Sequence, residues 1–422
     1  MILKNIRYLV TQNDDRQVIE DVDLLIHGDR VAGMGHELPV GDHQVVDCSG
    51  KVVMPGLVNA HTHASMTLLR GISDNKELED WLHEEIFPAE DKLEEEDAFI
   101  GALLGCIEML ETGTTTFNDM YDHMDQVAEA VDRTGIRAVL GRGLLDVDGE
   151  KDWRMDEAIE LVENYQGHDR IVPCFAPHGV YTASEQLLRE AKDCAEIFDT
   201  SYHIHVSETE KEMQDSINNN GRPPLKYLDD LGLVNDDLIA AHGVWLTDEE
   251  KGILAEKGGS VVHNPAANLK LGSGIAEVPE LLDNGINVAL GTDGVASNNN
   301  LNLFEEAKIA SILHKRRGPE VIDEQEILDM ATINGAKALG LEDEIGSIEL
   351  GKKADLLAID LNSADMTPIN GKKGLVSNLV YSFSGKVDDV IVDGEVVVRD
   401  GEIVKIGEGK VLEAAEKLAR KF

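Results

Sequence analysis

Basic residues are scarce in this chain. Its 422 residues include 38 Lys and Arg against 81 Asp and Glu, which gives a formal net charge of −43. A field of that sign repels nucleic acid and anionic membranes, so neither is expected as a partner. Because the acidic residues are spread along the sequence, we interpret them as a halophilic adaptation to a cytosol rich in salt, which screens the self-repulsion. Ordinary solvated helix faces are the alternative interpretation.

Long apolar runs and paired cysteines are also absent. No apolar run approaches the roughly 20 residues that a membrane helix needs. The residues after Met1 lack the apolar core of a secretion signal, so a cytoplasmic protein is expected. The four cysteines show no Cys-x-x-Cys spacing, which favours buried free thiols over disulfides or zinc knots; they are Cys48, Cys106, Cys174 and Cys194.

The order of elements predicts an α/β fold. A (β/α)8 TIM-like barrel of roughly 250 residues plus one smaller unit accounts for the length. Between residues 55 and 353, strand-like runs alternate with helical ones, including an expected helix over Glu324–Leu339. Eight candidate strands, the number that closes a barrel, end near His63, Asp119, Arg142, His178, Ser207, His242, Asn264 and Asp293.

The two ends of the chain have a different sequence pattern from the central part. Residues 1–54 and 354–422 both alternate short strand-like runs with turns. We expect them to meet as one small β-sandwich domain, with residues 55–353 forming a metal-dependent barrel and a helix ending the second β-rich part.

His61 and His63 stand two positions apart at the end of a predicted strand. Side chains alternate across a strand, so both imidazoles face one way. The strand is apolar and bounded by Pro55 and Gly56, which indicates a buried strand with polar residues at its C-terminal end. Active sites of (β/α)8 barrels lie at that end, so we expect a metal ion at the barrel mouth.

A metal needs three or four protein ligands, and two further strands offer them. His205 ends one β-type run, and Glu208 follows three residues later. Asp293 ends another, in which the alternate positions Ala289 and Gly291 are small and leave room for ligands.

These motifs resemble those of the amidohydrolase superfamily. Within it, the chain is most similar, nearly end to end, to the 5'-methylthioadenosine/S-adenosylhomocysteine deaminases. The motifs that carry the resemblance are His61-Thr-His63, His205-Val-Ser-Glu208, Ala-His242-Gly, His263-Asn-Pro-Ala-Ala-Asn and Gly-Thr-Asp293-Gly.

The resemblance implies one divalent metal per chain, held by His61, His63, His205 and Asp293. Three neutral imidazoles and a carboxylate suit Zn²⁺, with Fe²⁺ as the alternative by ligand type. Binuclear members of the superfamily place a carboxylated lysine at the end of the fourth strand. That strand here, Ile171–His178, has no lysine, so we expect a single metal.

The same resemblance assigns catalytic roles. Glu208 acts as a general acid on a ring nitrogen, although a salt bridge is the plainer alternative. Asp293 takes a proton from the attacking water and helps to pass it to the leaving amine. His242 hydrogen-bonds that water, with a satisfied core histidine as the alternative. His203 forms a second His-x-His pair with His205 but lies deeper in the strand, and we interpret it as packing.

Residues that bind substrate are inferred from the same family, and they include Glu208 and Asp293. Glu90 matches a carboxylate that holds ribose hydroxyls, although its acidic neighbours also suit a solvated charge run. His178 matches a ribose or ring contact. Arg142 and Arg154 suit a homocysteine carboxylate, because a guanidinium grips a carboxylate with two bonds; pairing with a neighbouring Asp is the alternative.

The predicted function is metal-dependent hydrolytic deamination of 5'-methylthioadenosine and S-adenosylhomocysteine to inosine analogues and ammonia. One alternative keeps the site and changes the substrate to 5'-deoxyadenosine, adenosine, guanine or a chlorotriazine. Another is a barrel that has lost catalysis and serves as an interaction protein. The expected partner is a small nucleoside, and the sequence leaves open whether the chain forms a homo-oligomer.

The acidic surface generates one prediction. Adding KCl, from low to molar concentration, should raise the thermal midpoint of unfolding, because salt screens repulsion among the excess carboxylates. Melting curves followed by circular dichroism measure this. A midpoint that stays level or falls would favour ordinary solvated helix faces instead.

Overall fold

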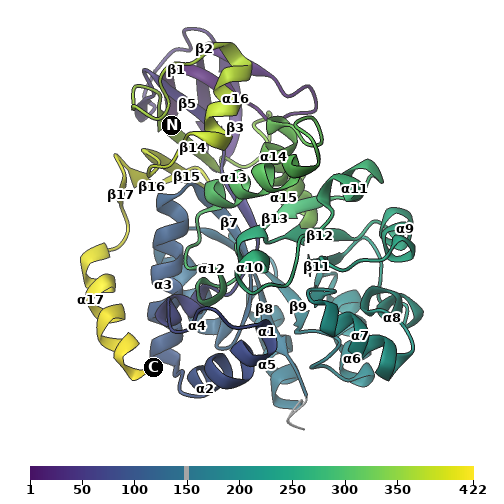
Figure 1. Ribbon diagram of the computed structural model, residues 1–422. Coiled ribbons are helices and arrows are strands. Elements are labelled where there is room, and N and C mark those ends of the chain that lie inside the picture. The colour runs from purple at the N-terminus through teal and green to yellow at the C-terminus, as the bar shows by residue number, and fades with distance from the viewer. Residues whose placement is uncertain (147–151) are drawn as a thin grey trace.

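The computed structural model describes residues 1–146 and 152–422, and its centre is a parallel eight-stranded barrel surrounded by helices (Figure 1). All eight predicted strands are present in sequence order around the barrel. They are β6 (Leu57–Thr62), β7 (Thr114–Tyr121), β8 (Arg137–Leu144), β9 (Ile171–Pro177), β10 (Tyr202–Val206), β11 (Leu238–His242), β12 (Ser260–His263) and β13 (Val288–Leu290).

The first and last barrel strands meet at the mouth. Thr62 and Asp293 form a parallel bridge, and the Asp293 N–H donates to the His61 carbonyl at 3.0 Å. Deeper in the barrel, the Asn59 amide donates to Thr292 Oγ1 at 2.8 Å and accepts from the Thr292 N–H at 3.0 Å. These bonds close the barrel exactly where the metal ligands were expected.

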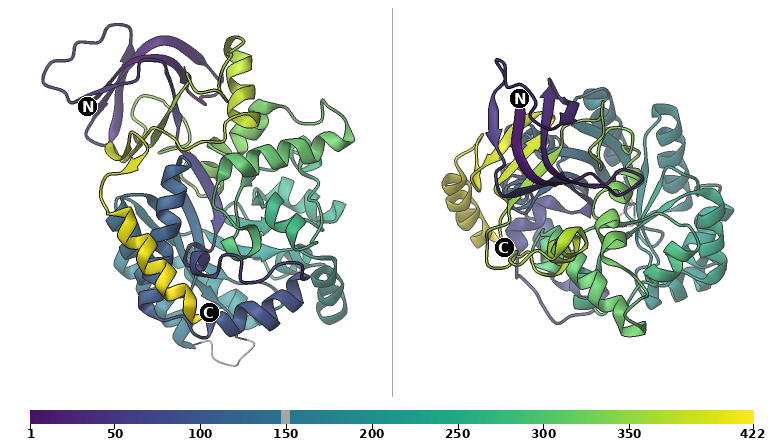
Figure 2. Two further views of the ribbon diagram at one scale, coloured as in Figure 1. Left: turned by 60° about the vertical axis from the view of Figure 1, so that its left-hand side comes forward. Right: turned by 90° about the horizontal axis from the view of Figure 1, so that it is seen from above.

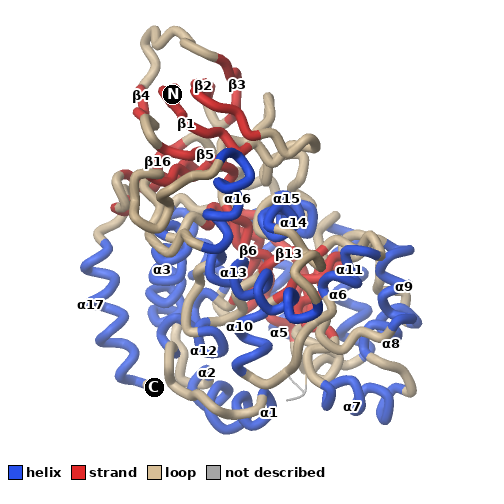
Figure 3. Tube along the Cα trace, turned by 45° about the horizontal axis from the view of Figure 1, so that its top comes forward, coloured by secondary structure: helices blue, strands red, loops and turns tan. Residues whose placement is uncertain are grey.

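A second sheet takes strands from both chain ends, as the sequence predicted (Figure 3). It encloses a separate apolar core that includes Leu24 and Ile391. Gly56 joins it to the barrel, where a Cβ would lie 2.0 Å from Thr115. Its strands are β1 (Ile2–Val10), β2 (Val18–His27), β3 (Arg30–Gly35), β4 (Val45–Asp47), β5 (Lys51–Pro55), β14 (Leu356–Asp360), β15 (Asp389–Val392), β16 (Glu395–Arg399) and β17 (Glu402–Ile403).

Helices cover the outside of the barrel, and α17 lies along α3 (Figure 2). The helices are α1 (Leu78–Trp81), α2 (Phe87–Glu90), α3 (Glu95–Glu111), α4 (Met124–Thr134), α5 (Asp152–Tyr165), α6 (Glu185–Phe198), α7 (Glu210–Asn220), α8 (Pro224–Asp230), α9 (Asp248–Lys257), α10 (Pro265–Lys270), α11 (Val278–Asp283), α12 (Val295–Asn298), α13 (Leu303–His314), α14 (Glu324–Met330), α15 (Ile333–Ala338), α16 (Gly371–Tyr381) and α17 (Glu408–Leu418).

The single helix predicted over Glu324–Leu339 was wrong, because α14 and α15 are separate. Thr332 interrupts them with φ −133° and ψ −93°. Its hydroxyl donates to the Leu328 carbonyl at 2.6 Å and accepts from Gln12 at 3.0 Å. A hydroxyl bonded to the preceding turn and to a distant side chain competes with regular helix.

A buried ion pair ties the barrel to the second sheet. Arg137, at the start of β8, donates to Asp355 at 2.7 Å and to Asp393 at 3.2 Å. All four cysteines are free thiols, as predicted. Among the described residues, no helix has the length and apolarity required to cross a bilayer.

Candidate metal centre and active site

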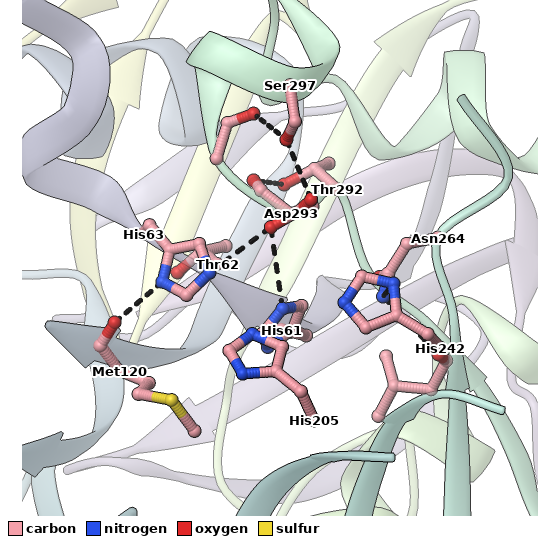
Figure 4. Close-up of polar contacts among 12 residues, drawn as sticks. His61, Thr62, His63, Met120, His205, His242, Asn264, Thr292, Asp293 and Ser297 are labelled. Carbon is pink, nitrogen blue, oxygen red and sulfur yellow. Dashed lines mark hydrogen bonds and ion pairs between the residues drawn. The ribbon is translucent and has the colours of Figure 1, made fainter. Parts of the chain in front are cut away.

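Four predicted ligands come from three barrel strands and converge at the mouth (Figure 4). Asp293 Oδ1 lies 3.5 Å from His61 Nε2 and 3.2 Å from His63 Nε2. Ligand atoms of His61, His63 and His205 lie within 4.8 Å of one another, and the same holds for His61, His242 and Asp293. A single metal ion suits a group of this size and composition.

Backbone carbonyls orient two of these imidazoles. The Nδ1 of His63 lies 2.6 Å from the Met120 carbonyl, and the Nδ1 of His205 lies 2.6 Å from the His178 carbonyl. A carbonyl only accepts, so each ring carries its proton on Nδ1 and presents the lone pair of Nε2 to the centre. Within the described part of the chain, His61 Nε2 is buried with no hydrogen-bond partner, which fits a metal ligand.

The ligand cage consists of His61, His63, His205 and Asp293, and the backbone around it allows neighbouring strands to approach these side chains closely. A Cβ at Gly291 would lie 2.4 Å from Asn264 Oδ1 and 3.0 Å from the His61 Cβ, so only glycine fits beside the ligand. His242 and Asp293 adopt left-handed backbone conformations, with φ of 75° and 60°. Such conformations are costly for these residue types and concentrate at functional sites.

Glu208 lies beside the cage and is suited to donate a proton. Its Oε2 is 3.7 Å from His242 Nε2, and Ser273 Oγ donates to its Oε1 at 3.3 Å. Burial, together with the charges of Asp293 and Glu212, raises the pKa of Glu208 well above its usual value. The direction of this shift favours the protonated form, which a general acid requires.

His242 is neutral and held by two amides. Its Nδ1 accepts from Asn268 at 2.9 Å and from Asn264 at 3.3 Å, which places the ring proton on Nε2. Burial lowers the pKa of His242 to about 3. Its Nε2–H can therefore donate to an oxygen at the centre of the cage.

A pocket opens from the cage toward β7 and β8. Its wall includes Trp81, Glu90, Tyr121, His178 and Tyr181. The Tyr121 hydroxyl donates to Glu90 at 2.6 Å, and burial raises the pKa of Glu90 to about 7. Glu90 and His178 thus both line this pocket, and their role as substrate contacts remains a prediction.

Arg142 and Arg154 are placed differently from the other predicted contacts. Arg142 does not line the pocket wall, and it forms ion pairs with Asp122 and, at 2.7 Å, with Glu157. Arg154 donates to the Leu145 carbonyl at 3.0 Å and stacks on a neighbouring Trp ring. Their proposed role as carboxylate ligands remains a prediction.

Sequence reasoning missed several residues that support the site. Glu212 accepts from the backbone N–H groups of Ser207 at 3.0 Å and Glu208 at 2.7 Å, and so fixes the backbone of Glu208. The Thr209-x-x-Glu212 pattern at the start of α7 signalled a capping carboxylate. Tyr121 carried no local signal, because its contact to Glu90 spans two elements.

Comparisons with known proteins agree with this geometry. Residues 52–397 match the model of the amidohydrolase family. A 5'-deoxyadenosine deaminase of Methanobrevibacter smithii is 44% identical over 93% of this chain and 92% of its own length. A 5-methylthioadenosine/S-adenosylhomocysteine deaminase of Acetivibrio thermocellus is 46% identical over 90% of this chain and 88% of its own. An adenosine deaminase structure from Xanthomonas campestris with bound zinc is 35% identical, with TM-score 0.94 over 100% of this chain and 98% of its own.

The cage generates a prediction about metal content. Substituting His61→Ala or Asp293→Ala should remove the metal, because each change deletes a ligand that the others cannot replace. Elemental analysis of purified protein should give one metal per chain for the wild type and a large loss in both variants. Two tightly held metals per chain would contradict the mononuclear site.

Proposed function

The chain belongs to the amidohydrolase family, and on that premise we propose that it hydrolytically deaminates adenine nucleosides altered at the 5' carbon. The proposed substrates are 5'-methylthioadenosine and 5'-deoxyadenosine, with S-adenosylhomocysteine as a further candidate. The observation that carries the proposal is the buried Glu208, whose pKa is raised and whose Oε2 lies 3.7 Å from His242 Nε2 beside the ligand cage. A water, a proton donor and a ring nitrogen can meet there.

His61, His63, His205 and Asp293 would hold the metal, with zinc preferred on the chemistry of the donors. When bound, a divalent metal lowers the pKa of a coordinated water toward about 7 and so supplies a nucleophile at neutral pH. The zinc in the Xanthomonas campestris structure supports this choice.

Each proton transfer is assigned to one side chain of the site. Glu208 donates its proton to the ring nitrogen next to C6 as water adds to C6, so negative charge does not build up on the purine. His242 hydrogen-bonds the attacking water. Asp293 takes one proton from that water and passes it to the amine, the C6–N bond breaks, and ammonia leaves. The second proton of the water returns to Glu208 as the C6 carbonyl of the inosine-type product forms.

The pocket wall favours a small 5' substituent. Asp122 lines the pocket, while Arg142 lies behind it and already pairs with Asp122 and Glu157. A substrate carboxylate would have to displace Asp122 before it could reach Arg142. This arrangement supports 5'-deoxyadenosine and methylthioadenosine over S-adenosylhomocysteine, and relatives with both kinds of name match the chain.

Glu208→Gln should keep the fold and the metal but lower kcat by about 10²- to 10⁴-fold, since an amide cannot deliver the ring proton. Steady-state ammonia release measures the rate, and metal analysis of the same preparation is the control. Near-normal turnover with metal retained would remove Glu208 from the mechanism.

Glu90 should make substrate binding depend on pH. Because its pKa is raised to about 7, it is protonated below that pH and becomes a carboxylate above it. Only the carboxylate accepts hydrogen bonds from two ribose hydroxyls, so KM should fall as pH rises through about 7. Glu90→Gln should raise KM and abolish this dependence; a variant with the wild-type profile would exclude Glu90 from ribose binding.

A panel of substrates tests the proposed function itself. We expect ammonia release from methylthioadenosine and 5'-deoxyadenosine far above that from free adenine, because ribose contacts orient C6 at the cage. Arg142→Met should slow S-adenosylhomocysteine more than methylthioadenosine if the arginine binds the carboxylate, and should slow both equally if it is structural. Better turnover of guanine or a chlorotriazine would refute the nucleoside assignment.

A further inference from the structure

His203 contacts a metal ligand rather than serving as packing alone. It lies in β10, two positions before His205, and is fully buried. Its Nε2 is 3.0 Å from the Nδ1 of His61. We infer that His203, together with Asn118, is a positioning residue that holds His61 in the orientation and tautomer that bind the metal.

His61 differs in this respect from the other two imidazoles of the cage. His63 and His205 each face a backbone carbonyl, which always accepts a hydrogen bond. The Nδ1 of His61 faces an imidazole nitrogen, which accepts in one tautomer and donates in the other. The state of His61 therefore depends on the state of His203.

One arrangement of protons allows His61 to bind through Nε2. His61 then carries its proton on Nδ1 and donates it to His203 Nε2. His203 in turn carries its proton on Nδ1, which faces the side-chain amide of Asn118 at 3.2 Å.

Asn118 determines which tautomer His203 can adopt. Among the described residues its Oδ1 is buried with no hydrogen-bond partner, while its Nδ2 donates to the Ala60 carbonyl at 2.9 Å and faces His203 Nδ1 at 3.2 Å. An amide nitrogen cannot accept, so a proton on His203 Nδ1 requires the amide to turn over, which gives up the bond to Ala60 and places Oδ1 against that carbonyl oxygen. The amide of Asn118 thus acts through His203 on the proton position of His61.

This inference rests on the proposed metal site but not on the proposed substrate. Without His203, the Nδ1–H of His61 would be left unpaired in the dry interior of the barrel. Loss of a partner to a metal-binding histidine typically lowers metal affinity about 10- to 100-fold. The effect can be measured with no substrate present.

The experiment compares zinc affinity in full-length variants, by competition against a chromophoric chelator. His203→Leu should weaken zinc binding about 10- to 100-fold. His203→Gln should restore most of it, because its amide oxygen reaches the position of the lost Nε2. His203→Asn is too short to reach His61 and should resemble the leucine variant. Cobalt-loaded protein should show an altered visible spectrum in the leucine and asparagine variants only.

His314→Leu is the matched control. His314 is also fully buried, and neither of its ring nitrogens has a hydrogen-bond partner. Its replacement should leave zinc affinity unchanged. Equal losses in His314→Leu and His203→Leu, or equal affinities of the glutamine and asparagine variants, would overturn the inference. Wild-type protein that binds no zinc would instead refute the metal site on which it rests.

Discussion

Closure of the barrel between its first and last strands is the constraint on which the site depends. His61 lies on β6, His63 directly follows it, and Asp293 follows β13, so more than 200 residues separate ligands that must meet within a few ångströms. The bridge between Thr62 and Asp293 lies at the ligands themselves. The paired bonds of Asn59 with Thr292, buried below it, set the register. The metal site is therefore built by the same contacts that complete the fold.

Closure at this point also explains the residues around the cage. The interior of the barrel is packed by small and branched side chains, among them Ala60, Val262 and Ala289. Gly291 lets β13 approach the ring of His61. The left-handed conformations at His242 and Asp293 then turn their side chains toward the centre. The packing below the strand ends offsets the conformational cost of these left-handed residues.

Local patterns could predict the strands and ligands, because alternation along a strand determines which side chains share a face. Alternation placed His61 and His63 on one face, and the family resemblance added His205 and Asp293 to the ligand set. The structure brings these four side chains together, and their role as ligands remains a prediction. Contacts that join distant elements left no such pattern. The break at Thr332 depends on Gln12, and the pairing of His203 with His61 depends on the depth of two strands in the barrel. The second sheet was predicted only in outline, because both chain ends share a pattern of short strand-like runs and turns.

Apart from Asp122, which pairs with Arg142, the carboxylates that line the pocket have no Lys or Arg partner among the described residues that line it. Glu90, Asp122, Glu208 and Asp293 line it, and none of its described lining residues is Lys or Arg. Buried carboxylates without a partner are costly, so each needs its own solution. Burial and neighbouring charges raise the pKa of Glu208, whereas the nearby imidazoles of His61 and His63 outweigh the effect of burial and hold the pKa of Asp293 well below its usual value. The pKa values of these two acids are thus shifted in opposite directions, which suits one to donate a proton and the other to bind a cation.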